Sequence, residues 1–256
     1  MAHGFPEPGP EAVCAEEDAL SRLLTRAAPA PQPILYGNDP DQVYEAYGPT
    51  NGPVVMVVHG GYFRPTIDRT HARPMARALA DSGVRVVLAE YRRTPGRPDH
   101  STDDLAALED HLADHDQLPC LWVGHSAGGQ LVLQRATDAD RPAVPVIALA
   151  PVTGLIRAAV EGLGNSAVTA WMGGTPEELP DAYRRSDPQV RLTLPHDQRP
   201  DILLLHGTDD VTVPVTHSVT FDAPSTILSG AHHFDLVDPE SSYWPRVLAA
   251  VLDRVS

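Results

Sequence analysis

The chain contains no lysine, and all 19 of its basic residues are arginines. Schiff-base enzymes, pyridoxal-phosphate enzymes and Walker A nucleotide-binding proteins each depend on a lysine side chain. The sequence therefore excludes these three classes of protein.

Basic residues are also few relative to acidic ones. The 34 aspartates and glutamates outnumber the 19 arginines, which gives a formal net charge of −15 at pH 7. Binding to a nucleic-acid backbone requires clustered basic residues. We therefore expect no nucleic-acid partner.

Cysteine is scarce as well. The two cysteines, Cys14 and Cys120, are far apart in the sequence and lack the spacing of metal ligands. A disulfide framework is therefore not expected, and neither cysteine indicates a metal site. Cys120 begins an apolar run, which predicts a small, buried hydrophobic residue.

Long apolar runs are missing. No run approaches the roughly 18 residues that indicate a membrane-spanning helix. The first residues, "MAHGFPEPGPEAVCAEED", are acidic and proline-rich and lack the charged and apolar regions of a signal peptide. We therefore expect a cytoplasmic protein without a membrane partner.

Short apolar runs are present, and they alternate with segments of helical periodicity. The runs lie at 53–60, 84–91, 120–124, 143–152, 201–207 and 224–230. Because they are continuous in Val, Ile and Leu, they are typical of parallel strands covered on both faces. Helices are predicted near 70–82 and 102–116, after Ser126 and near 243–256, and Ser101 and Asp104 are spaced like a capping box for the second of these. This alternation predicts a single α/β domain over residues 1–256, with a mostly parallel central sheet flanked by helices.

Three segments depart from the alternation. Residues 1–33 predict a proline-rich arm around one helix, and residues 33–47 predict an antiparallel edge hairpin. Residues 153–198 are rich in glycine and proline and are too long for a simple loop. We expect this interval to form a small helical cap over the carboxyl edge of the sheet, where such sheets bind their ligands.

The sequence "GHSAG", residues 124–128, fits the G-x-S-x-G pattern of a nucleophile elbow. It lies directly after a predicted strand and directly before a predicted helix, which is the context that the elbow requires. A sharp turn at this point leaves no room for large flanking side chains. The pattern therefore predicts that Ser126 is a nucleophile rather than an ordinary turn residue.

The segment "HGGY", residues 59–62, follows another predicted strand. Its glycines allow the backbone to turn amide groups toward a developing oxyanion, and the candidate donors are the N–H groups of Gly61, Tyr62 and Ala127. We expect His59 to organise this loop rather than to transfer protons.

A nucleophilic serine needs a base and an acid downstream of it in this kind of fold. Asp209 and Asp210 both follow the strand predicted at 201–207, and His232 and His233 are adjacent near the end of the chain. The spacing of the residues does not choose within either pair.

Four motifs together, "HGGY", "GHSAGG", "HGTDDVTVP" and "GAHHFD", resemble the α/β-hydrolase superfamily, in the branch of HGG-type esterases and hormone-sensitive-lipase-like enzymes. Within that branch, "HGGYFRP" and "AEYRRTPGRP" are most similar to kynurenine formamidases and their bacterial relatives. The resemblance covers roughly residues 34–256 and leaves the N-terminal arm unexplained.

The resemblance implies which members of the two pairs act. The acid segment of the family reads H-G-T-x-D-x-x-V-P, which implies that Asp210 is the acid. The family's histidine follows a glycine by three positions, as His233 follows Gly230, which implies that His233 is the base. Tyr62 stands where the lipase-like branch has a third glycine, so the oxyanion loop should match the formamidase-like form.

We therefore expect a serine hydrolase that cleaves a small carboxylic ester or an aryl formamide through an acyl-enzyme. Ser126 would attack, His233 would accept its proton, and Asp210 would orient His233. A thioesterase, an acyltransferase or a cyclase would use the same residues. A sensor that binds a ligand without catalysis is the alternative from another class. No metal and no organic cofactor are expected.

The residues that bind the substrate are less clearly indicated. Phe63, Trp171 and Met172 could line an acyl pocket, although ordinary packing of the cap would explain them equally well. His125 and His232 are further candidates for binding the substrate, and His232 is expected at the rim of the site. The expected partner is a small acyl substrate, and the sequence leaves the oligomeric state open, with a homodimer as one alternative.

Overall fold

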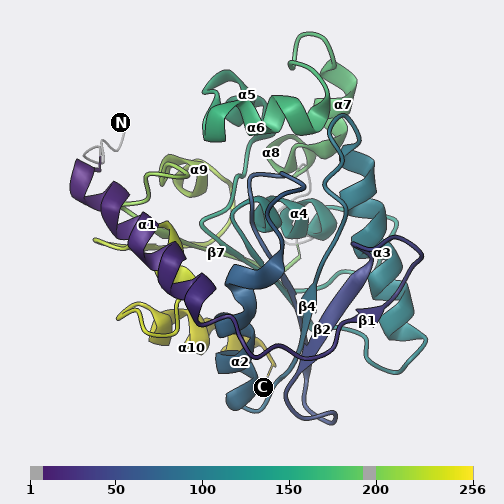
Figure 1. The fold of residues 1–256 in the computed structure, drawn as a ribbon. Coiled ribbons are helices and arrows are strands. Elements are labelled where there is room, and N and C mark those ends of the chain that lie inside the picture. The colour runs from purple at the N-terminus through teal and green to yellow at the C-terminus, as the bar shows by residue number, and fades with distance from the viewer. Residues whose placement is uncertain (1–7, 193–199, 256) are drawn as a thin grey trace.

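The computed structural model describes residues 8–192 and 200–255. Its centre is an eight-stranded sheet in the order β1-β2-β4-β3-β5-β6-β7-β8 (Figure 1). The strands are β1 (Ile34–Leu35), β2 (Val43–Tyr47), β3 (Val54–Val58), β4 (Arg85–Ala89), β5 (Leu121–His125), β6 (Val146–Leu149), β7 (Ile202–Gly207) and β8 (Ser225–Leu228). The β1–β2 and β2–β4 pairs are antiparallel and the others are parallel, so the predicted edge hairpin and parallel sheet are both confirmed.

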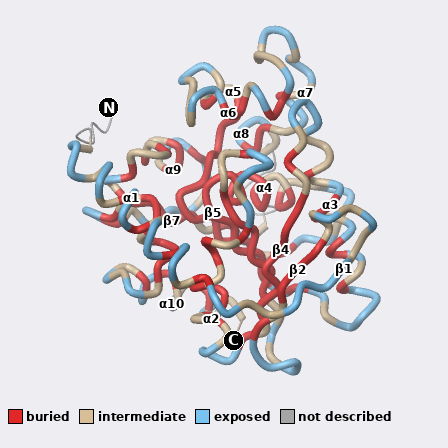
Figure 2. The backbone as a smooth tube through the Cα atoms, viewed as in Figure 1, coloured by how far each residue is buried: buried red, intermediate tan, exposed pale blue. Residues whose placement is uncertain are grey.

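Alternate residues of each central strand enter two separate hydrophobic layers. In β3, Met56 and Val58 pack with the helices α3 (Pro98–Ala113) and α4 (Ala127–Ala136). Val55 and Val57 pack with α1 (Pro10–Thr25), α2 (Arg73–Asp81) and α10 (Trp244–Val255) on the other face. The sheet is accordingly the buried centre of the molecule (Figure 2). Within the described ranges, no helix is both long enough and apolar enough to cross a membrane.

Helix α3 begins earlier than the sequence predicted. Its first residue is Pro98, a residue favoured in the first turn because proline has no N–H to leave unpaired. Ser101 and Asp104 therefore lie inside the helix and do not form a capping box. The Ser101 hydroxyl donates to the carbonyl oxygen of Arg92 at 2.7 Å, and Asp104 binds the Arg92 guanidinium.

The prediction for Cys120 was wrong, because its side chain is exposed. Cys120 precedes β5 by one residue and so lies at the amino edge of the sheet. Its Sγ atom lies 3.3 Å from the carbonyl oxygen of Val54, to which it donates. The apolar residues that follow Cys120 are buried, whereas Cys120 itself is exposed.

Four short helices lie over the carboxyl end of the sheet, between β6 and β7 (Figure 1). They are α5 (Leu155–Val160), α6 (Leu163–Met172), α7 (Pro180–Ser186) and α8 (Pro188–Arg191), and we call them the cap. The backbone of residues 164–166 in α6 has positive φ angles, which interrupt the helix. Residues 193–198 of the predicted cap interval, and residues 1–7 of the predicted arm, lie outside the described residues.

Candidate active site

Ser126 occupies a sharp turn between β5 and α4. Its φ and ψ angles are 57° and −118°, a conformation that costs a non-glycine residue roughly 1–3 kcal/mol. Two glycines make the turn possible: a Cβ atom on Gly124 would lie 2.3 Å from the Gly128 carbonyl oxygen, and one on Gly128 would lie 2.2 Å from that of Val58. Ser126 is also the N-cap of α4, so the unpaired N–H groups at the start of that helix lie beside it.

Asp210 and His233 form a buried hydrogen-bonded pair. The His233 Nδ1 atom lies 2.7 Å from Asp210 Oδ2, and the two residues are each 2% exposed. The second oxygen, Oδ1, accepts the backbone N–H groups of Thr212 at 3.0 Å and Val213 at 2.7 Å. His206 Nε2 adds a further contact of 3.1 Å to Oδ2. The carboxylate is therefore oriented by four donors, one of which is His233.

The electrostatics of the pair favour its charged form. Burial alone would raise the pKa of Asp210, but His233 and His206 hold the pKa of that carboxyl well below its usual range. Burial alone would lower the pKa of His233, but the charge and hydrogen bond of Asp210, helped by Glu16, raise it above its usual value of 6.5. The arrangement suits a group that must become an imidazolium during a reaction.

The neighbours Asp209 and His232 lie elsewhere. Asp209 is exposed and its Oδ1 atom accepts the hydroxyl of Thr208 at 2.8 Å. His232 precedes the 3₁₀ helix η3 (His233–Leu236), and its backbone N–H donates to Asp235 Oδ2 at 2.9 Å. The structure thus brings Asp210 and His233 together and leaves Asp209 and His232 outside the pair.

His125, a predicted substrate-binding residue, packs against the candidate base. Its ring centroid is 4.5 Å from that of His233, and its Nε2 atom donates to the His233 carbonyl oxygen at 3.1 Å. Burial, followed by the nearby His233 and His71, lowers the pKa of His125 well below its usual value. His125 therefore stays neutral and supports the turn that carries His233.

The loop after β3 has three consecutive residues with positive φ: Gly61 at 136°, Tyr62 at 54° and Phe63 at 53°. Two strained non-glycine residues in a row indicate a constrained functional loop. The loop lies against the nucleophile elbow, because a Cβ atom on Gly60 would be 2.8 Å from Ser126 Cβ. The amides of Gly61, Tyr62 and Ala127 therefore come from the two segments that meet at Ser126.

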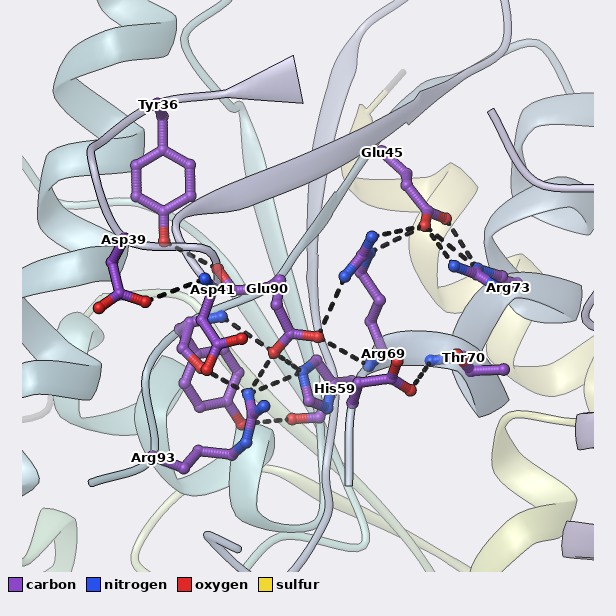
Figure 3. A network of polar contacts seen from close by, with 12 residues as sticks. Tyr36, Asp39, Asp41, Glu45, His59, Arg69, Thr70, Arg73, Glu90 and Arg93 are labelled. Carbon is purple, nitrogen blue, oxygen red and sulfur yellow. Dashed lines mark hydrogen bonds and ion pairs between the residues drawn. The ribbon is translucent and has the colours of Figure 1, made fainter. Parts of the chain in front are cut away.

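A buried ionic network supports this loop from behind (Figure 3). His59 contacts the carbonyl oxygen of Gly60 through Nδ1 and Glu90 Oε1 through Nε2, the latter at 3.0 Å. Glu90 also pairs with Arg93 and Arg69, and His59 together with these arginines holds the pKa of Glu90 well below the usual range although burial opposes ionisation. The predicted structural role of His59 is consistent with these contacts. Arg92, which lies between Glu90 and Arg93 in the sequence, pairs with Asp104 instead.

A narrow pocket with a cavity volume of about 20 Å³ adjoins Ser126. Its walls come from the loop after β3, the start of α4, the segment after β6, the cap and the loop after β7: Tyr62, Phe63, Ala127, Val152, Leu163, Ala167, Val168, Thr212 and Val213. Phe63 is stacked on Trp171, with ring centroids 4.1 Å apart. Trp171 and Met172 are 1% and 2% exposed and pack in the core behind this wall. Among the predicted substrate-binding residues, Phe63 thus lines the pocket.

The remaining histidines give no sign of a metal site. His111 and His115 lie side by side on α3, and His115 Nδ1 donates to the carbonyl oxygen of His111 at 2.7 Å. Across residues 8–192 and 200–255, no group of three metal-ligating side chains is arranged to hold an ion.

Sequence reasoning missed Glu16, which lies in α1 and contacts both loops of the Asp210–His233 pair. It belongs to an acidic stretch, "AEED", that carries no motif. The contact between His206 and Asp210 was also missed, although both residues lie in the motif "HGTDD".

The strand order with its antiparallel β2, the elbow at Ser126 and the histidine–carboxylate pair after the last strands together define an α/β-hydrolase. The profile of the prolyl oligopeptidase family matches residues 76–224, which is more than half of the chain. The chain belongs to this family, and its α/β-hydrolase fold is as predicted.

Known proteins with related sequences and structures agree with this class. Human protein ABHD12B is 27% identical over 189 residues, which are 68% of this chain and 50% of ABHD12B, so the chain spans about half the length of that relative. Esterase B of Lactobacillus rhamnosis is similar in structure, with a TM-score of 0.69, 19% identity and coverage of 95% of this chain and 94% of its own. A hyperthermophilic esterase from Pyrobaculum calidifontis has a TM-score of 0.64, 19% identity and coverage of 95% and 92%.

Proposed function

We propose that this α/β-hydrolase is a serine esterase that cleaves small carboxylic esters through an acyl-enzyme. The observation that carries the proposal is the meeting of the strained Ser126 turn with the pocket beside it, close to the buried Asp210–His233 pair. In this arrangement Ser126 is the nucleophile, His233 the general base and Asp210 the orienting acid.

Acylation begins when Ser126 Oγ attacks the ester carbonyl carbon. The Oγ proton passes to His233 Nε2, because Nδ1 is engaged by Asp210. The carbonyl oxygen becomes an oxyanion that accepts hydrogen bonds from the N–H groups of Gly61, Tyr62 and Ala127. When the tetrahedral intermediate collapses, the C–O bond to the alcohol breaks and His233 returns the proton to the leaving oxygen.

Deacylation repeats the sequence with water. His233 takes a proton from the water as its oxygen attacks the acyl carbon, and the carboxylic acid leaves as the proton returns to Ser126 Oγ. Asp210 remains ionised throughout and stabilises the imidazolium in both steps.

The pocket argues for a short acyl group. Its cavity volume of about 20 Å³ lies far below the range of roughly 300–1,000 Å³ typical of sites for drug-sized ligands. The walls are mostly apolar, so a small aliphatic acyl chain would bury its surface there. A structural neighbour with a TM-score of 0.68, esterase B of Lactobacillus rhamnosis, has been solved with a tributyrin phosphonate inhibitor.

A panel of substrates would test which acyl group and which leaving group the enzyme prefers. Initial rates would be measured with p-nitrophenyl acetate, butyrate, hexanoate and octanoate, with N-formylkynurenine, and with a prolyl p-nitroanilide. We expect kcat/KM to be highest for the acetate or butyrate. A preference for N-formylkynurenine would assign the formamidase activity, and a preference for the anilide would assign a peptidase and overturn the esterase proposal.

A second measurement separates hydrolysis from acyl transfer. In single turnovers with a p-nitrophenyl ester, the acyl-enzyme would be offered hydroxylamine or methanol at rising concentration. We expect water to remain the main acceptor. Transfer that outruns hydrolysis at modest nucleophile concentration would favour an acyltransferase. A protein whose Ser126 is not labelled by a fluorophosphonate probe would be a non-catalytic binder.

A further inference from the structure

Glu16 is a buried carboxylate on α1 that reaches into the candidate active site. The residue is 4% exposed. Its Oε1 atom accepts the backbone N–H of Val211 at 2.8 Å and that of His233 at 3.1 Å. Its Oε2 atom accepts the hydroxyl of Thr212 at 2.7 Å. One side chain therefore holds both the loop that follows Asp210 and the turn that carries His233.

We propose that Glu16 is a positioning residue of the active site and that helix α1 completes the acid–base machinery. This inference rests on the proposed function, because it assigns Glu16 a role in the reaction of Ser126 and His233. The role has two parts. The carboxylate fixes the two loops relative to each other, and its negative charge acts on the His233 imidazole.

The hydrogen bonds of Glu16 extend to the loop after β3, which contains Tyr62. Because the Thr212 hydroxyl donates its proton to Glu16, its oxygen is free to accept, and the Tyr62 hydroxyl lies 3.3 Å from it. A chain of hydrogen bonds therefore runs from Tyr62 through Thr212 to Glu16. Tyr62 and Thr212 both line the pocket beside Ser126. Glu16 thus fixes a wall of the pocket as well as the acid–base pair.

Helix α1 is itself firmly attached. Ala19 and Leu23 are fully buried in the hydrophobic layer that also contains η3. At the end of the helix, Arg26 pairs with the buried Asp238 at 3.1 Å. Arg77 of α2 donates to the carbonyl oxygens of Arg26, Ala27 and Pro29. These contacts fix the position of α1, so the three hydrogen bonds of Glu16 are a stable part of the folded structure.

The charge of Glu16 is not neutralised by its hydrogen-bond donors, which are two backbone N–H groups and a hydroxyl. Burial lowers the pKa of His233, whereas Asp210 and then Glu16 raise it. Among residues 8–192 and 200–255, the other titratable groups that face His233, directly or through Asp210, are the imidazoles of His71, His125 and His206. Of these, His71 has its pKa lowered to about 3 by burial, and His125 has its pKa lowered well below the usual value. His71 and His125 therefore remain neutral where His233 titrates.

Two substitutions separate the two parts of the role. In Glu16→Gln, the amide oxygen can accept both backbone N–H groups while the amide nitrogen donates to Thr212, whose hydroxyl then donates to Tyr62. This variant keeps the contacts and removes the charge. Glu16→Ala removes both. Glu17 is exposed on the same helix, so Glu17→Gln and Glu17→Ala are matched controls.

The experiment compares these variants with the wild-type chain in p-nitrophenyl acetate hydrolysis across pH 5–9. Thermal unfolding and NMR titration of His233 are measured beside it. For Glu16→Gln we expect a lower pKa of His233 and an acid limb of kcat/KM displaced to lower pH, with a plateau kcat reduced by less than about 10-fold. For Glu16→Ala we expect kcat to fall by up to about 100-fold with little change in KM, because the base is misplaced.

Several results would overturn the proposal. The charge part fails if Glu16→Gln and Glu17→Gln have the same His233 pKa and the same acid limb. The positioning part fails if Glu16→Ala keeps the kcat of Glu17→Ala, or if the loss of kcat in Glu16→Ala is no larger than its loss of folded protein. If the wild-type chain neither hydrolyses esters nor labels at Ser126, the proposed function fails, and the NMR titration still decides whether Glu16 sets the pKa of His233.

Discussion

The Nε2 atom of His125 lies 3.1 Å from the carbonyl oxygen of His233. The residue before the candidate nucleophile is therefore hydrogen-bonded to the backbone of the candidate base. The two residues are 108 positions apart in the sequence. The bond joins the end of β5 to the start of η3. Because this hydrogen bond couples the end of β5 to η3, a shift of the Ser126 turn would also shift the His233 imidazole.

The first prediction concerns the nucleophile and the base. Ser126→Ala and His233→Ala should each lower kcat by about 10⁴-fold or more, and the double variant should lose little beyond either single one, because the two groups act as a unit. His232→Ala is the control, since its contacts are with Asp235. Steady-state kinetics with p-nitrophenyl acetate would measure the losses. Equal damage from His232→Ala and His233→Ala would contradict the assignment.

The second prediction distinguishes the two adjacent aspartates. Asp210→Asn should lower kcat by about 10⁴-fold, because the amide cannot hold the imidazole in the required tautomer or stabilise its cation. Asp209→Asn should leave kcat within a few-fold of wild type, because Asp209 is exposed and accepts only the hydroxyl of Thr208 among the contacts described. The measurement is kcat/KM for both variants under the same conditions, and a larger loss in Asp209→Asn would reverse the assignment.

The third prediction is the pH dependence of the reaction. A general base must be neutral, and the pKa of His233 lies above its usual value of 6.5 because of Asp210. The rate kcat/KM should therefore rise with pH through the raised pKa and reach a plateau above it. The same shift has the opposite sign for stability: the protonated pair stabilises the fold at low pH, and that contribution is lost as pH rises through the raised pKa. A pH profile without an acid limb above pH 6.5 would contradict the geometry.

The fourth prediction tests the network of Figure 3. Glu90→Gln should lower the free energy of unfolding by about 3–5 kcal/mol, because it leaves the buried Arg93 without its counter-charge, whereas Arg69 keeps its pair with Glu45. The pKa of Glu90 is lowered in the folded state, so its contribution is complete above the unfolded value of about 4.3 and is lost at lower pH. Urea unfolding at pH 7 would measure the difference, with the exposed Glu17→Gln as a control. A loss no larger than that of the control would show that the network contributes little.

The sequence predicted those features that depend on local spacing. Strands β3 and β4 were found because strands buried on both faces must be apolar, as residues 54–58 and 86–89 are. The Ser126 turn was found because its geometry excludes a side chain at Gly124 and Gly128. In these cases one physical requirement acts on neighbouring residues, and the pattern is visible without the fold.

Features that depend on contacts between distant residues were missed. Ser101 and Asp104 had capping-box spacing, but the loop after β4 recruits them to Arg92. The spacing of residues did not choose between the adjacent Asp209 and Asp210, and only the resemblance implied Asp210, because it is the direction of the chain after β7 that brings this residue to His233. The partners of Glu16 are 195 to 217 positions away, so nothing near Glu16 in the sequence indicates them.

Those separations also bear on the order in which the molecule is assembled. Each contact of Glu16 closes a loop of nearly the whole chain, and such closure is entropically costly until the intervening sheet has formed. The parallel core can therefore be complete while the first helix is still undocked. The last step of folding would then be the docking of α1 against the segments that carry Val211 and His233. Before this step the chain would be nearly native but inactive.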